Sequence, residues 1–121
     1  MTPDRPTSLG DVITACRALI DPVCDFDLIR DRNRSALVSS IRILVVGAAF
    51  DMPRLRPSLH EVQDAIGYRS HAYIVVHRQR WIDLPDDIRV AWIADVQTAI
   101  DGPGVPVMSP AVRKHIESYR Q

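Results

Sequence analysis

Apolar residues recur every three to four positions along most of this chain, which is the spacing of the buried face of an α-helix. Over residues 9–20 the pattern follows a capping-box pair, Ser8 and Asp11, and stops at Pro22. Valine, isoleucine and glycine within residues 35–50 are poor helix formers, but the length of that segment favours a helix over a strand. The sequence therefore predicts an all-α, compact helical domain of about six helices. The predicted segments are 9–20, a single turn at 25–29, 35–50, 58–66, 70–81, 85–101 and 110–119.

Two of the predicted helices are separated by only a few residues. An S-x-x-E capping box at Ser58 starts the first helix, and Gly67 is placed to end it in the left-handed conformation. The second helix begins near Ser70, with residues 74–76 predicted as its buried side and Trp81 returning to the core. Two capped helices joined by such a short turn are typical of a helix-turn-helix.

The chain is predicted to divide after residue 101. Residues 1–101 form the helix-turn-helix domain, and residues 102–121 form a stiff linker with two prolines and a short amphipathic helix. A helix this short is marginal in water unless its apolar stripe is covered. The cover is either this domain itself or a second protein, such as a transcription co-factor or an RNA polymerase subunit. The candidate partner-binding residues are those of the stripe, Val112, Ile116 and Tyr119.

Length and composition limit the class of protein. A chain of 121 residues with 46% hydrophobic and 25% charged residues suits one soluble domain. No apolar run reaches the ~18–20 residues of a membrane span, and the first residues lack the basic start and apolar centre of a signal peptide, so a cytoplasmic protein is expected. The histidines and cysteines fit no metal-ligand spacing, and no phosphate-binding loop or nucleophile elbow occurs. We therefore expect no enzyme activity, no metal or other cofactor, and no small-molecule substrate.

Charge is unevenly distributed along the chain. The formal net charge is zero, but residues 29–80 contain nine arginines and four acidic residues, a local excess of five positive charges. Fourteen of the fifteen basic residues of the whole chain are arginines, and the exception is Lys114. Arginine makes bidentate contacts with phosphate and guanine, although a GC-rich genome produces the same bias. The basic middle of the chain indicates a surface that attracts a polyanion.

The stretch SLHEVQDAIGYRSHAYIVV (58–76) resembles the signature of the C-terminal DNA-binding domain of the bacterial replication initiator DnaA, a Trp-repressor-like helix-turn-helix. That signature reads approximately S-L-x-E-I-x-x-x-F-G-G-R-D-H-T-T-V-L, and the identical positions here are Ser58, Leu59, Glu61, Gly67, Arg69 and His71. The order of elements is similar from residue 9 to residue 101, including a basic loop before a long helix. The initiator's nucleotide-hydrolysing module has no counterpart. The resemblance therefore implies a stand-alone DNA-binding domain, similar to the DNA-binding part of activators of gene transfer agents.

Two sets of DNA contacts are predicted, and within them the resemblance itself implies Arg69, His71 and one arginine of the basic loop. The major-groove contacts are Arg69, Ser70, His71, Ala72 and Tyr73, and the phosphate or minor-groove contacts are Arg30, Arg32, Arg34, Arg42, Ser58 and Arg78. One of the three arginines of the loop at residues 30–34 is expected to enter the minor groove. This chain has Ser70, Ala72 and Tyr73 where the family has an acidic residue and two threonines, so a different DNA site is expected. Tyr73 either contacts bases or turns into the core.

Two functions of different classes follow. The first is a sequence-specific transcriptional regulator that binds double-stranded DNA, associates with the nucleoid and activates phage-like or gene-transfer-agent genes. The second is a protein-interaction module on the same helical fold that has lost DNA binding. The zero net charge and the changes at Ala72 and Tyr73 favour this second function. Affinity for DNA at low salt distinguishes them, because a pure protein-binding module would have none.

Overall fold

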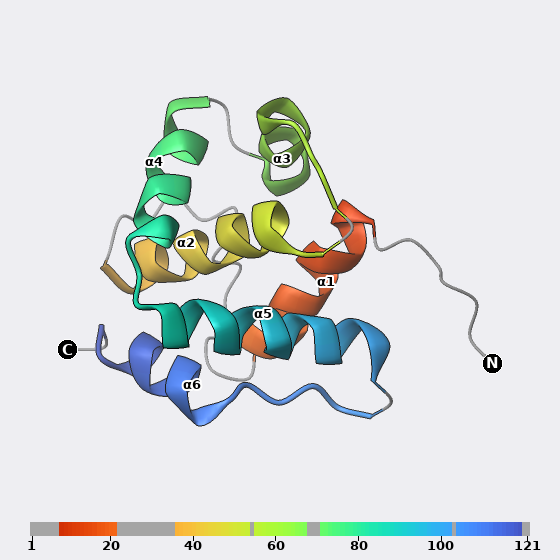
Figure 1. Ribbon diagram of the computed structural model, residues 1–121, viewed down its shortest axis with the longest axis vertical. Coiled ribbons are helices and arrows are strands. Elements are labelled where there is room, and N and C mark those ends of the chain that lie inside the picture. The colour runs from red at the N-terminus through yellow and green to blue at the C-terminus, as the bar shows by residue number, and fades with distance from the viewer. Residues whose placement is uncertain (1–7, 22–35, 54, 68–70, 103, 120–121) are drawn as a thin grey trace.

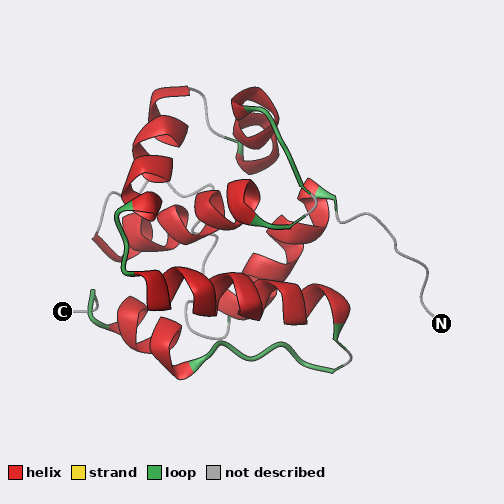
Figure 2. Ribbon diagram, viewed as in Figure 1, coloured by secondary structure: helices red, strands yellow, loops and turns green. Residues whose placement is uncertain are grey.

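The computed structural model describes residues 8–21, 36–53, 55–67, 71–102 and 104–119, and within them it contains six α-helices joined by turns and loops (Figures 1 and 2). The helices are α1 (Leu9–Ile20), α2 (Ala36–Asp51), α3 (Leu59–Ile66), α4 (His71–Ile82), α5 (Asp86–Asp101) and α6 (Pro110–Glu117). The predicted all-α class is therefore confirmed, and each predicted helix lies close to an observed one. The turn expected at residues 25–29 lies outside the described residues.

Helix α2 is the centre of the domain. It contacts each of the other five helices, and Figure 1 shows α3 and α4 on one side of it and α5 and α6 on the other. A helix that is apolar on all sides has to be surrounded by other elements, and α2 has this composition. Although α2 is the most apolar helix, neither it nor any other helix in the described segments is long and apolar enough to cross a bilayer. Its buried residues are Val38, Ser40, Ile41, Leu44, Val45, Val46, Gly47, Ala48 and Ala49.

The predicted helix starts depend on short-range hydrogen bonds. At α1 the backbone N–H of Asp11 donates to Ser8 Oγ over 3.0 Å, and the Ser8 N–H donates to the Asp11 carboxylate over 3.2 Å. Ser58 and Glu61 form the same reciprocal pair at α3, with both distances 3.1 Å. Gly67 ends α3 at φ +91°, in the left-handed region that favours glycine. Both capping boxes and the glycine cap are thereby confirmed.

Two tryptophans attach neighbouring helices to α2. The indole of Trp81 in α4 lies directly over Gly47, and its N–H donates to the carboxylate of Asp51 over 2.6 Å. The indole N–H of Trp92 in α5 donates to the backbone carbonyl of Leu44 over 2.8 Å. Both rings are fully buried, and a buried indole N–H without a partner would be costly. These two contacts fix α4 and α5 against the central helix.

Helix α6 packs against α5 and α2 rather than standing free. Val112 and Ile116 are fully buried within the same hydrophobic core as the other helices, and Met108 of the preceding segment joins them. The segment is also held by the N–H of Ser109, which donates to the Asp95 carboxylate over 2.8 Å.

The prediction that Val112 and Ile116 bind a partner is therefore wrong, because their own domain already covers them. Of the two alternatives left open by the sequence, cover by this domain or by a second protein, the structure shows the first for these two residues. Tyr119, the third residue of the predicted stripe, follows the end of α6 and is 41% exposed.

Gly47→Ala is expected to lower the free energy of unfolding by ~1–3 kcal/mol, because the added methyl group would collide with the Trp81 ring. The ring is fully buried and hydrogen-bonded, so it has little room to move. This loss should outweigh the ~0.5–1 kcal/mol that alanine normally gains over glycine in a helix. Urea denaturation followed by far-ultraviolet circular dichroism measures the difference.

Gly10→Ala is the matched control for this substitution. A methyl group at Gly10 in α1 would meet only Ser8 Oγ, at the ordinary distance of 3.7 Å. We expect this variant to be as stable as the wild type or more so. Equal stability of Gly47→Ala and Gly10→Ala would contradict the close packing of the Trp81 ring on Gly47.

Candidate nucleic-acid interface

The predicted helix-turn-helix corresponds to α3 and α4, which contact each other on the same side of α2 (Figure 1). Residues 68–70, between Gly67 and the start of α4, lie outside the described residues. The predicted contacts Arg69 and Ser70 therefore have no described position, and the same holds for Arg30, Arg32 and Arg34. What the structure describes is the body of α4 and its surroundings.

Helix α4 has one buried side and one exposed side. Ile74 and Trp81 are buried, whereas Val75 and Val76 are 50% and 48% exposed. The prediction that residues 74–76 together form the buried side is wrong for these two valines. Three consecutive residues span about 200° of a helix, so they cannot all face one neighbour. The buried stripe instead continues from Ile74 to Trp81, two turns later.

The first turn of α4 is exposed. His71, Ala72 and Tyr73 all lie on the surface, and Tyr73 is 53% exposed. Of the two alternatives for Tyr73, the structure therefore excludes the core. The sequence-predicted major-groove residues that the structure describes are thus gathered at one accessible helix end.

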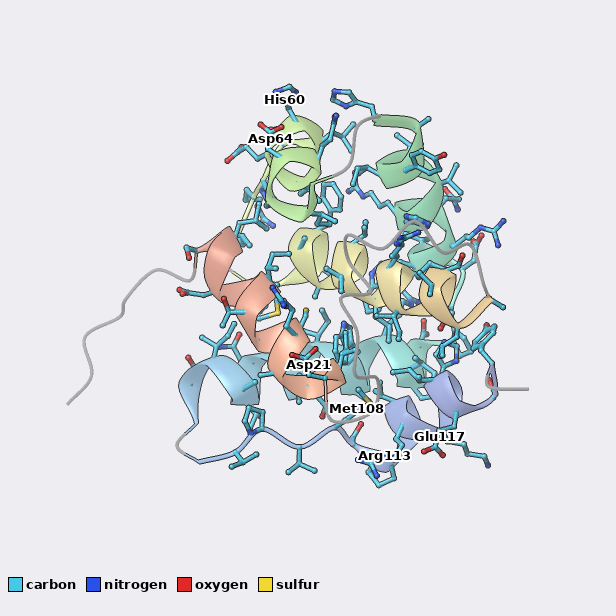
Figure 3. The ribbon with its side chains drawn as sticks, turned by 180° about the vertical axis from the view of Figure 1, so that it is seen from behind. Asp21, His60, Asp64, Met108, Arg113 and Glu117 are labelled. Carbon is cyan, nitrogen blue, oxygen red and sulfur yellow. The ribbon has the colours of Figure 1, made fainter. Side chains whose placement is uncertain are left out.

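His71 also lies beside a residue that the sequence did not single out as a contact. Its ring centroid is 5.6 Å from that of His60 in α3, and His60 Nε2 is 3.5 Å from the carboxylate of Asp64. Figure 3 shows His60 and Asp64 together at one end of the molecule. Their i, i+4 spacing in α3 was visible in the sequence, but the approach to His71 depends on how α3 and α4 pack.

A second group of charges forms where α4 meets α2. His77 is half-buried, and its pKa is lowered to about 4 by burial and then by the positive charges of Arg42 and Arg80. Arg42 was predicted from the sequence, whereas His77 and Arg80 were not chosen as contacts. Their separation of three residues places them on neighbouring positions of α4, but only the packing of α2 brings Arg42 to them. The result is a concentration of positive charge beside the exposed side of α4.

The other two predicted phosphate contacts have defined intramolecular partners. The guanidinium carbon of Arg78 lies 4.4 Å from the ring centroid of Phe50, a cation–π arrangement that holds this exposed side chain against α2. The hydroxyl oxygen of Ser58 accepts the Glu61 N–H of the α3 capping box. Ser58 therefore has a structural role at the start of α3, and it is exposed there.

The described residues contain no group of three or more histidine, cysteine, aspartate or glutamate side chains placed to hold a metal ion. Cys16 is fully buried in α1, and burial raises the pKa of its thiol. Comparison of the chain with protein-family models, with curated proteins and with solved structures finds no match.

Acid is expected to destabilise the wild type more than His77→Gln. Near pH 6.5 the unfolded chain binds a proton at His77, but the folded protein does not until about pH 4. In this window the unfolded state holds more protons, so the free energy of unfolding falls as the pH falls. Glutamine does not titrate, and the variant should therefore lose less stability between about pH 6.5 and pH 4. Thermal unfolding at several pH values measures the difference.

His115, whose pKa is also lowered by burial, contributes in the same direction and is present in both proteins. It therefore cancels when the two pH profiles are subtracted. Parallel profiles for the wild type and His77→Gln would contradict the burial of His77 near the positive charges of Arg42 and Arg80.

Proposed function

We propose that this protein is a sequence-specific transcriptional regulator that binds duplex DNA with α4 in the major groove. The observation that carries the proposal is the exposed side of α4, which has the positive charges of Arg42 and Arg80 beside it. A helix of this kind fits the major groove, where its N-terminal residues meet base edges while nearby arginines meet phosphates. No acidic residue occurs in α4 to repel the phosphates.

The sequence resemblance supports the same function. It supplies the arginine-rich loop at residues 30–34 for the minor groove and phosphates, and Arg69 with His71 for base edges. The regulator is proposed to act at the nucleoid, as an activator of phage-like or gene-transfer-agent genes. Because Ser70, Ala72 and Tyr73 replace the family's base-reading residues, the proposed target differs from the initiator's own site.

A protein-interaction module is the second candidate, and the half-exposed Tyr73, Val75 and Val76 favour it. An exposed apolar patch is a common feature of protein interfaces. In this case the partner would be a transcription co-factor or a polymerase subunit. Gel shifts at two salt concentrations separate the candidates, since only the DNA-binding regulator should retain duplex DNA at low salt.

Arg80→Ala is expected to weaken binding to a duplex selected from genomic DNA several-fold. Loss of one phosphate contact should also reduce the slope of log affinity against log salt concentration by ~0.9 in magnitude. Arg80 is exposed, so its removal should not prevent folding. Fluorescence anisotropy titrations between about 50 and 200 mM salt measure both quantities.

Arg113→Ala is the matched control because Arg113 is also exposed but belongs to α6, at the opposite end of the molecule from His60 (Figure 3). Its removal should leave the affinity and the salt slope close to those of the wild type. The proposal fails if the wild type has no affinity for duplex DNA at low salt. Equal salt slopes for the two variants would instead remove Arg80 from the interface.

A further inference from the structure

The exposed side of α4 is mainly apolar near its start. Ala72, Tyr73, Val75 and Val76, here called the apolar face, are all exposed, and the last three are each about half exposed. Ala72 is three residues from Val75 and four from Val76, and Tyr73 is three residues from Val76, so these pairs are neighbours on the helix surface. They lie away from Ile74 and Trp81, which attach α4 to the core. These four side chains therefore lie outside the buried contact that Ile74 and Trp81 make with the core.

The surroundings of the apolar face are cationic. Arg78 and Arg80 follow it in α4, and the positive charge of Arg42 in α2 acts on His77 of α4. An occupant of this surface should carry negative charge at its edges and apolar groups at its centre. The major groove of DNA has this arrangement, with phosphates along both rims and thymine C5-methyl groups on its floor.

Polar readers of base edges are scarce on this part of α4. The amide of Gln79 donates to the Asp83 carboxylate over 3.2 Å, which directs it toward the end of the helix. Alanine and other apolar side chains distinguish thymine from other bases by contact with its methyl group, because no other base edge in the groove carries one. The chemistry of the face thus matches the methyl group better than a hydrogen-bonding edge.

We infer that the apolar face recognises thymine methyl groups, so that the preferred DNA site places thymines beneath the first two turns of α4. This inference rests on the proposed function and specifies the chemical group that the same surface reads. Tyr73 and Val76 are the principal specificity-determining side chains, since they present a large apolar area next to each other on the face.

The test compares thymine with deoxyuridine, which lacks only the C5-methyl group. A duplex selected by the full-length protein from random sequence is synthesised with each thymine replaced singly by deoxyuridine. Affinities are then measured by fluorescence anisotropy at constant salt. The wild type should bind about fourfold more weakly for each contacted methyl group removed, which corresponds to ~0.8 kcal/mol.

The variant Val76→Ala tests whether the preference for thymine over deoxyuridine depends on the apolar face. This variant should lose most of its preference for thymine over deoxyuridine at one position while keeping the preference at the others, as expected for direct coupling. Val90→Ala is the matched control, because Val90 is 70% exposed but lies in α5. It should retain the complete thymine preference of the wild type.

Two results would overturn the inference without affecting the proposed function. One is a wild type that prefers the selected duplex over random DNA yet binds all deoxyuridine duplexes equally well. The other is a Val76→Ala variant with an unchanged thymine preference at every position. That result would show that the apolar face does not contact thymine and would favour a protein partner for it. Absence of any duplex binding at low salt is a different result, and it would overturn the proposed function itself.

Discussion

The contact between Trp81 and the bare backbone at Gly47 determines how α4 sits on the domain. A side chain at position 47 would occupy the space of the indole ring, and the hydrogen bond to Asp51 fixes the ring's orientation within that space. Once Trp81 is seated, the rotation of α4 about its own axis is fixed as well. Ile74 then faces the core two turns earlier, and Ala72, Tyr73, Val75 and Val76 face outward. The exposed surface of α4 is therefore a consequence of one close approach between two helices.

The same packing places positive charges near one another. Burial, and then the positive charges of Arg42 and Arg80, lower the pKa of the half-buried His77 to about 4. Like charges in proximity destabilise a folded protein, and they are less costly when a polyanion lies over them. In the function proposed above, contacts between these arginines and phosphates would offset this repulsion.

The side of α2 opposite α3 and α4 packs against α5 and α6. Trp92 connects α5 to the Leu44 carbonyl, and α6 closes the core with Val112 and Ile116. The C-terminal segment therefore contributes to the same hydrophobic core instead of offering an apolar stripe to another protein. Helices α5 and α6 thus pack against one side of α2, and α4, which carries the candidate interface, packs against another.

Short-range features were predictable from the sequence. The helices, the capping boxes at Ser8 and Ser58 and the left-handed end at Gly67 depend on residues three or four positions apart, so the sequence alone determines them. The placement of His71 and Ala72 at an accessible helix end also followed from such signals, whereas the exposure of Tyr73 was decided by the structure. The buried side of α4 and the cover of α6 did not, because each depends on which distant helix lies opposite.

Tertiary structure alone decided which charges meet. Arg80 is three residues from His77 on the same helix, but Arg42 is almost forty positions from Arg80 and no local pattern relates it to either residue. Likewise, Val75 and Val76 are exposed because Trp81 packs on Gly47 and thereby fixes the rotation of α4. A helical pattern in the sequence gives the spacing of side chains but not the direction in which they face.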